Sequence, residues 1–472
     1  MTDKLDHQRL PSLQDLRTRG ILNEHKNNKV NVYEVARWIR HDRRYTFVTI
    51  KELISSRNNS QGIHIYEKGV YKSEGGVVIE EETQALLGTH NKCTNQIVRE
   101  VIGQIKRHHI ISLREFDQDP YRINVANDWI DVRTLEFDHH SPDDFSLVQL
   151  PVAYDPEAVC PQFRQVLKDW VGPERVPLME EIFGYCLIKK MPFHKLFIFV
   201  GDGFNGKDTC LATLRALLGD KNCSNVGLKD LCGDRFASAN LHGKLANIAT
   251  ELSPRYIKDT ERIKALTGES VIDAPIKHVQ KPISFESYAT PIFACNTMPD
   301  FDDDTDAFHE RLVVIPFIGQ WLSSDPRQIP ELKDKLMDEL SGILNLALQG
   351  LQRLLTNKRF SEPVMTADEK RSLHKKLADS VVAFMDEEME QTSSTEDKLY
   401  LQDAWLIFQT WMQKKGYIRI GRNRFYDKLR KAVVQNPKKD TKVGKDYING
   451  WKLLYPPSEL EECPKNGKQG TL

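Results

Sequence analysis

The sequence lacks the usual marks of a secreted, membrane-spanning or zinc-binding protein. Its eight cysteines form no C-x-x-C pair, which argues against a zinc site and favours reduced thiols in a cytosolic protein. No run of about 18 apolar residues occurs in the chain, so no segment is expected to cross a membrane. The first residues, MTDKLDHQRLPSLQDLR, contain no apolar stretch, so we expect no signal peptide. We therefore expect a cytoplasmic protein.

An excess of one charge is also missing. The chain has 66 Lys and Arg against 67 Asp and Glu, a net charge of −1. Any nucleic-acid surface must therefore be local. No internal repeat is present, and 472 residues predict about three domains.

The most informative stretch is KLFIFVGDGFNGKDT, residues 195–209. An apolar run ends in a glycine-rich turn, and a helix-like stretch follows, which is the context that a phosphate-binding loop requires. Glycines let backbone N–H groups face a polyphosphate, and the helix N-terminus adds partial positive charge. Lys207 would reach the β and γ phosphates. The predicted nucleotide-binding residues are Gly201, Asp202, Gly203, Phe204, Asn205, Gly206, Lys207, Asp208 and Thr209.

Hydrolysis also needs a carboxylate, a polar sensor and a positive charge near the γ-phosphate. Glu251 ends a short apolar strand and is the candidate to polarise water and to organise Mg²⁺, helped by Asp208, which stands where a hydroxyl is usual. Asn296 ends the strand PIFACN and can contact the γ-phosphate, although it can also cap a turn. Arg311 begins a strand and can reach a neighbouring subunit's nucleotide, or pair with Glu310.

As a set, these motifs resemble the superfamily 3 helicases, and more closely the primase-associated helicases of phages, plasmids and poxviruses. The resemblance rests on GDGFNGKDT, LHGKLANIATE, IKALTGESVIDAPIKHVQKPISF, PIFACNTMP and DAFHERLVVIPF, in this order. It implies an AAA+ core, a hexameric ring, ATP hydrolysis with Mg²⁺ between subunits, and movement on single-stranded DNA. By position it assigns catalysis to Lys207, Glu251, Asn296 and Arg311, with Mg²⁺ near Asp208 and Glu251.

The family's DNA-contacting hairpin falls on residues 268–281, with Lys277 and His278 near its centre and Lys281 behind. A basic cluster there suits backbone tracking in a channel, although a solvated loop would look the same. Three departures from the family pattern put the rate of hydrolysis and the hairpin detail in doubt: Asp208, the sequence Gly268-Glu269-Ser270, and Glu310 before Arg311.

The carboxyl-terminal region is predicted to be a winged helix. An amphipathic helix at 401–416, a second helix at 424–433 and a hairpin follow one another. Trp405, Phe408 and Trp411 form an aromatic stripe that we assign to the core. Between Lys414 and Lys452 there are 13 basic and 3 acidic residues, a difference of +10, which favours phosphate contacts. The predicted DNA-binding residues here are Arg422, Arg424, Lys428 and Lys431.

These observations predict an α/β protein: an AAA+ core with a parallel sheet, an α+β amino-terminal domain and a carboxyl-terminal winged helix. The expected division is a polar segment 1–62, an amino-terminal domain 63–153, a helical collar 154–190, the core 191–357 closed by a long helix at 332–355, a connector 358–378, the winged helix 379–457 and a disordered tail 458–472.

The predicted function is an ATP-dependent DNA helicase that replicates a virus, phage or plasmid, in the host cytoplasm if viral. Its expected partners are single-stranded and forked DNA, further copies of itself, and a separate primase or origin-binding protein, since the first 150 residues show no convincing catalytic acids for primer synthesis. Alternatives are a nucleotide-binding origin or scaffold ring with weak or no hydrolysis, and an AAA+ remodeller of proteins, which the basic carboxyl terminus disfavours.

Overall fold

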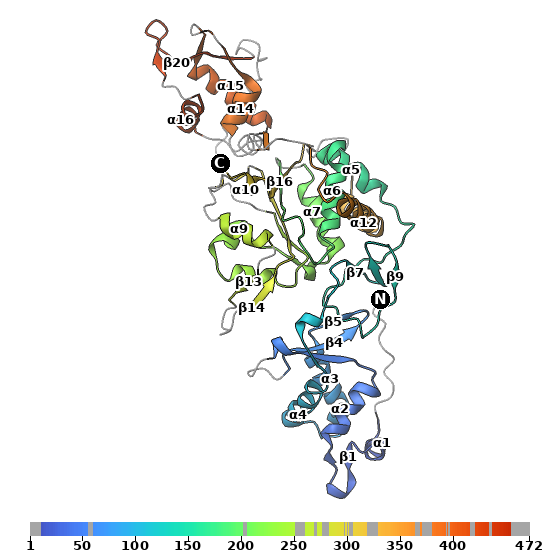
Figure 1. Cartoon of the computed structure of the whole chain (residues 1–472). Helices are drawn as coiled ribbons and strands as arrows, with labels where there is room; N and C mark the ends of the chain where they lie inside the picture. Colours follow the sequence, from blue (N-terminus) through green and yellow to red (C-terminus); the bar gives the residue numbers. More distant parts are fainter. Residues whose placement is uncertain are drawn as a thin grey trace, which may run out of the picture.

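The computed structural model describes most of the chain as three successive units (Figure 1). The described residues are 11–54, 60–201, 205–250, 260–268, 271–275, 283–296, 298–299, 301, 305–318, 329–363, 369–370, 380–392, 394, 397–415, 421–433 and 437–454. Several predicted positions lie outside them: Asp202, Gly203, Phe204, Glu251, Lys277, His278, Lys281 and the tail 458–472.

The amino-terminal unit combines helices with a four-stranded sheet of order β5-β4-β3-β6. Its elements are α1 (Leu13–Thr18), β1 (Leu22–Asn23), β2 (Lys29–Val30), α2 (Val32–His41), β3 (Phe47–Ile50), β4 (Ile63–Glu67), β5 (Val70–Lys72), α3 (Gly75–Gly88), α4 (Asn95–Lys106) and β6 (Ile110–Ile111). Because β3 pairs with β4, hydrogen bonds cross position 62. The segment before position 62 therefore shares one hydrophobic core with the residues after it. This core includes Leu16 and Val35 from before that position, and Ile63 and Ile79 from after it.

A small three-stranded sheet follows, formed by β7 (Arg122–Asn124), β8 (Trp129–Asp131) and β9 (Phe137–Asp138). Its buried residues Ile123 and Ile130 belong to the same core as the helices of the next unit. This sheet thus packs against the central unit rather than against the α2–α4 helices.

The central unit has a five-stranded sheet of order β11-β12-β15-β10-β16, in which every pairing is parallel. The strands are β10 (Leu196–Val200), β11 (Cys223–Ser224), β12 (Ala246–Ala249), β15 (Thr290–Cys295) and β16 (Leu312–Pro316). The other elements are α7 (Lys207–Leu218), α8 (Leu228–Gly233), α9 (Thr260–Thr267), the hairpin strands β13 (Val271–Ala274) and β14 (Ile283–Glu286), and α10 (Asp306–His309).

Strand β10, which lies between β15 and β16, is buried on both faces, as its unbroken apolar sequence predicts. Phe197 and Phe199 face a core shared with α7 and the collar helices. Ile198 and Val200 face a second core on the other side of the sheet. A strand so placed fixes the position of Gly201, which directly follows it.

The collar contains α5 (Pro161–Val171) and α6 (Val176–Tyr185), against which α11 (Leu332–Asp338) and α12 (Leu340–Asn357) of the central unit pack. The expected single helix at 332–355 is thus two helices, interrupted at Glu339. The Glu339 carboxylate accepts hydrogen bonds from the backbone N–H groups of Gln162 (3.0 Å) and Phe163 (2.9 Å). The interruption lets this carboxylate cap the exposed N–H groups at the start of α5.

The carboxyl-terminal unit packs three helices against short antiparallel strands. Its elements are α14 (Ser380–Glu388), β17 (Met389–Gln391), β18 (Lys398–Tyr400), α15 (Leu401–Lys415), α16 (Arg422–Val433), β19 (Lys438–Lys439), β20 (Asp446–Asn449) and β21 (Trp451–Leu453). Phe408 and Trp411 are buried, and the Phe408 ring stacks on Phe425 at 4.3 Å between centroids. The aromatic stripe is therefore core, as the sequence predicts. No described helix is long and apolar enough to cross a membrane.

Candidate nucleotide site

The predicted phosphate loop connects strand β10 to helix α7. Gly201 directly follows the strand, and Gly206 precedes the helix with a φ of +88°, which strongly favours glycine. A Cβ on Gly206 would lie 2.2 Å from Nε1 of Trp170 in α5. The collar thus closes directly over the turn, and position 206 has room for glycine alone.

Lys207 is buried and turned back across its own loop. Its Nζ donates to the carbonyl oxygen of Gly201 and to Oδ1 of Asn205, the latter at 3.1 Å. Asn205 is itself buried, and its Nδ2 donates to the carbonyl oxygen of Phe317 at 3.5 Å. These neutral oxygens hold the ammonium group in place beside the loop, where a phosphate can replace them with a stronger, charge-assisted bond.

Asp208 and Thr209 lie in the first turn of α7, and Asp208 is exposed. An acid is electrostatically favoured at a helix N-terminus, and its oxygens are ligands that Mg²⁺ accepts. Among the described residues no group of three or more His, Cys, Asp and Glu side chains could hold a metal ion. Glu251, the other predicted Mg²⁺ ligand, lies outside them, so within the described chain the fit to Mg²⁺ rests on Asp208 together with the phosphate loop.

Asn296 lies beside the phosphate loop. It directly follows β15, and Val200 pairs with Cys295, so continuing the register sets Asn296 next to Gly201. Its side chain is exposed. Strand β12 ends at Ala249 on the same edge of the sheet, two residues before Glu251. Three adjacent parallel strands therefore end near the loop, which is where ligands bind in sheets of this kind.

Arg311 lies at the opposite ends of the strands from the loop, where β10 and β16 begin. It precedes β16, whose Leu312 pairs with Leu196 at the start of β10. Continuing this register, Arg311 is level with Lys195, six residues before Gly201, or about 20 Å away at the usual rise. The Nη1 group of Arg311 donates to the Ala307 carbonyl oxygen at 2.8 Å, whereas its buried Nε has no hydrogen-bond partner among the described residues. Arg311 therefore does not reach the loop of its own chain.

The predicted DNA-contacting segment is partly described. Strands β13 and β14 pair antiparallel, with Val271 opposite Glu286 and Ala274 opposite Ile283. The basic residues predicted for its tip, Lys277, His278 and Lys281, lie outside the described chain.

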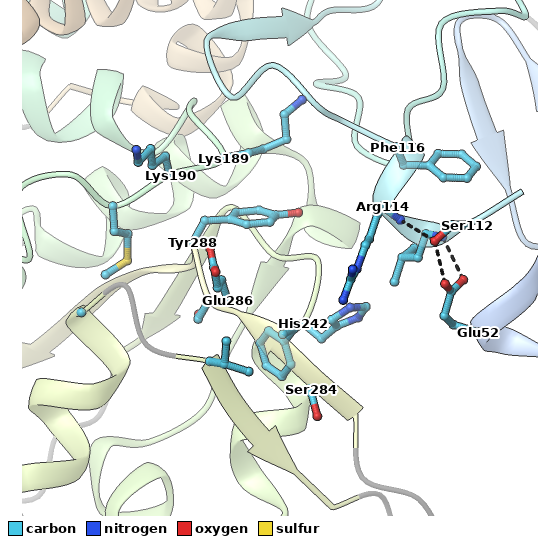
Figure 2. Close-up of a pocket in the computed structure, with 16 residues that line it drawn as sticks. Glu52, Ser112, Arg114, Phe116, Lys189, Lys190, His242, Ser284, Glu286 and Tyr288 are labelled. Atoms are coloured by element: carbon cyan, nitrogen blue, oxygen red, sulfur yellow. Dashed lines mark hydrogen bonds between the residues drawn. The ribbon is translucent and has the colours of Figure 1, made fainter.

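A cavity of about 900 Å³ lies between the amino-terminal unit and the central unit, beside β14 (Figure 2). Arg114 and Glu52 line it from one side, and His242, Glu286 and Tyr288 from the other. Burial raises the pKa of Tyr288. None of the predicted nucleotide-binding residues lines this cavity, so it is separate from the phosphate loop.

The predicted DNA-binding residues of the last unit lie on α16. Phe425 and Leu429 face the core of the unit, whereas Lys431 is exposed and Lys428 half-buried. Arg422 lies over the ring of Tyr426 and donates to its hydroxyl at 2.8 Å. The backbone of Arg424 lies in α16, but its side chain is outside the described part.

Sequence reasoning missed Trp170 as part of the phosphate loop. Trp170 precedes Gly206 by more than 30 positions and belongs to another helix, so the loop motif carries no signal for it. Its place in an apolar helix directly upstream was visible, but that pattern indicates only a buried face.

Three family profiles match successive parts of the chain. Residues 19–172 match "D5 N terminal like", residues 199–311 match "Family of unknown function (DUF5906)", and residues 376–453 match "Poxvirus D5 protein-like". A predicted helicase of Acanthamoeba polyphaga mimivirus is 25% identical over 225 residues, which are 44% of this chain and 23% of that protein. The chain thus matches less than a quarter of the length of this viral relative.

Solved structures of the NrS-1 C-terminal region in apo form are also similar. One has a TM-score of 0.47 at 14% identity and covers 74% of this chain and 75% of its own. Another has a TM-score of 0.46 at 12% identity and covers 89% of this chain and 98% of its own. D5-type profiles thus match both ends of the chain, and a viral helicase is among its relatives, so this chain is similar to the D5-like viral helicases.

Proposed function

We propose that this chain is the motor of a DNA helicase that replicates a mobile element, with an AAA+ core of the superfamily 3 type. It binds ATP and Mg²⁺ at the β10–α7 loop and assembles into a ring, expected to be a hexamer. In this proposal Lys207 holds the β and γ phosphates, Asn296 contacts the γ-phosphate, and Glu251 activates the attacking water. ATP and Mg²⁺ supply the substrate phosphates and the charge that stabilises them.

The observation that carries the proposal is the position of Arg311. It lies at the far edge of the sheet from Lys207, with a buried Nε that lacks a partner among the described residues. Its Nη1 donates to the Ala307 carbonyl oxygen of its own chain, which holds the guanidinium on this side of the sheet. A ring in which one protomer holds the nucleotide and the next supplies Arg311 places both groups where phosphoryl transfer needs them.

DNA binding is assigned to two regions. The β13–β14 hairpin, with Lys277, His278 and Lys281, would follow single-stranded DNA in the ring channel. The carboxyl-terminal unit would act as a winged helix on forked duplex DNA through α16. A separate primase or origin-binding partner, and action in the host cytoplasm, complete the proposal.

The first prediction is DNA-stimulated ATPase activity that depends on Lys207. Wild-type protein should hydrolyse ATP faster with single-stranded DNA, and Lys207→Ala should abolish this turnover because the phosphates lose their cation. Phosphate release measured with and without oligonucleotide tests this. A wild type without activity, matched by Lys207→Ala, would remove the helicase proposal.

The second prediction concerns the composite site. Lys207→Ala and Arg311→Ala should each be inactive, but mixing them should restore part of the turnover, because some interfaces then combine an intact loop with an intact arginine. Co-assembly of the two variants is verified by pull-down of differently tagged copies. Co-assembled mixtures as inactive as their parents would contradict action in trans.

A second candidate function is a nucleotide-binding ring for origin recognition, with weak or no hydrolysis. The exposed Asp208, an anion beside the phosphates, favours it. This candidate predicts that ATP binding is detectable by calorimetry while DNA stimulates no turnover.

A further inference from the structure

The chain passes beside Arg311 again on its way to the carboxyl-terminal unit. After α12, Phe360 is buried among Tyr185, Phe193 and Phe197. Ser361 then donates its backbone N–H and its hydroxyl to the fully buried carboxylate of Glu181, both at 2.6 Å. The start of the connector is therefore held firmly against the central unit.

Beyond this anchor, Glu362 and Lys370 of the connector join Lys195 and Glu310 in a row of four alternating charges. Glu362 accepts from Lys195 Nζ at 2.9 Å, and Lys370 Nζ lies 3.8 Å from the other oxygen of Glu362. Lys370 also donates to both carboxylate oxygens of Glu310, at 2.9 and 3.0 Å. The side chains of Lys195, Glu362 and Lys370 are only 14–18% exposed. Such a partly buried network is stronger than an isolated surface ion pair.

This row of charges lies next to the backbone of Arg311, which also bonds to the start of β10. Lys195 Nζ donates to the carbonyl oxygen of Glu310 at 2.7 Å, and the N–H of Leu196 donates to the carbonyl oxygen of Arg311 at 2.8 Å. The hydrogen bond from Lys370 also lowers the pKa of Glu310, which keeps that carboxylate ionised. The backbone of residues 310 and 311 is thus bonded to Lys195 and Leu196, and the connector holds the side chain of Glu310 through Lys370.

We propose that Lys370 and Glu362 are positioning residues that hold Arg311 for the neighbouring nucleotide, so that the connector to the carboxyl-terminal unit controls the trans site. The inference rests on the proposed ATPase function and adds residues that no motif contains.

The kinetic test is the variant Lys370→Ala in the full chain. Its kcat for ATP should fall by roughly 10- to 100-fold, the scale of a displacement of a catalytic group by up to about 1 Å, whereas removal of a trans arginine costs about 10³-fold or more. KM for ATP should stay unchanged, because the phosphate loop is untouched, and Lys370→Arg should recover most of kcat. The matched control is Arg359→Ala, an exposed connector cation without an ion pair among the described residues, which should leave kcat and KM as in wild type.

The decisive test is complementation. Co-assembled with Lys207→Ala, which supplies an intact Arg311, Lys370→Ala should regain wild-type turnover at the shared interfaces. Co-assembled with Arg311→Ala, it should regain none. If Lys370→Ala has wild-type kcat, or is rescued equally by both partners, the connector only attaches the last unit and the inference is overturned while the ATPase function stands. A wild type without ATPase activity would instead overturn the proposed function itself.

Discussion

At the residue scale, the candidate site depends on glycine at position 206, where no side chain would fit. Gly206 combines a positive φ with direct contact against Trp170, so the collar and the phosphate loop meet without a gap. Lys207 next to it is held by the oxygens of Gly201 and Asn205. Sequence alone predicted the glycine and the lysine, since both belong to the motif, but it did not predict the tryptophan that makes the glycine obligatory.

We predict that Gly206→Ala loses nucleotide binding. The added methyl group costs about 1 kcal/mol in backbone strain and also collides with Trp170, which shifts the loop or the collar. ATP affinity measured by calorimetry should fall by at least tenfold. The control Gly243→Ala has a similar φ of +69° but open space around it, so it should show the strain alone and bind ATP normally.

Asp440 predicts a pH dependence for the carboxyl-terminal unit. Hydrogen bonds from Lys398 (2.9 Å), the Lys442 backbone (3.0 Å) and Tyr400 (3.2 Å) lower the pKa of Asp440 to about 2. A carboxyl group with a lowered pKa stabilises the fold above its unfolded pKa of about 4, and that contribution is lost as pH falls towards 2. Asp440→Asn should therefore unfold at a lower temperature than wild type at pH 7, and the difference should shrink below pH 4. A difference that is constant with pH in scanning calorimetry would contradict this.

At the element scale, the sequence pattern predicted α15 and α16 within two residues at each end, but it did not predict the break in the long helix at 332–355. The same pattern runs without interruption from 332 to 355, yet the chain breaks at Glu339 because its carboxylate caps α5. That partner lies 176 and 177 positions away, and no local signal points to it.

The variant Glu339→Ala tests this cap. Removing two charge-assisted hydrogen bonds from the start of α5 should lower the free energy of unfolding by about 1–2 kcal/mol. Chemical denaturation followed by circular dichroism measures the change. Glu157→Ala, an exposed acid in the preceding loop, should change it little, and an equal loss in both variants would mean that the effect is general charge rather than capping.

At the scale of the whole molecule, the basic charge is concentrated in the last unit. Part of it is used internally, since Lys445 pairs with Asp403 at 3.0 Å and Lys452 with Glu390 at 3.1 Å. Lys431 on α16 and Lys438 and Lys439 on β19 are exposed. These residues remain available for DNA phosphates. The number of phosphate contacts should therefore be smaller than the charge difference of +10 between Lys414 and Lys452 suggests.

Removing residues 379–472 should weaken binding to duplex DNA and flatten its dependence on salt. Each lost phosphate contact reduces the slope of log K against log salt by about 0.9. Fluorescence anisotropy at several salt concentrations gives both quantities. An unchanged slope would show that these lysines form a solvated face. The triple variant of Lys431, Lys438 and Lys439 to Ala should reproduce most of the effect with the fold intact.

The sequence by itself determined the phosphate loop, the buried strand before it and the aromatic core of the last unit, because these are patterns of neighbouring residues with local physical causes. Only the tertiary structure decided that Trp170 covers Gly206, that Arg311 lies across the sheet from Lys207, and that Lys370 returns to Glu310. It also joined the polar residues before position 62 to the sheet after it. These contacts connect positions far apart in the chain, and they arise from the order of the parallel strands and from the packing of the collar, which a local pattern does not specify.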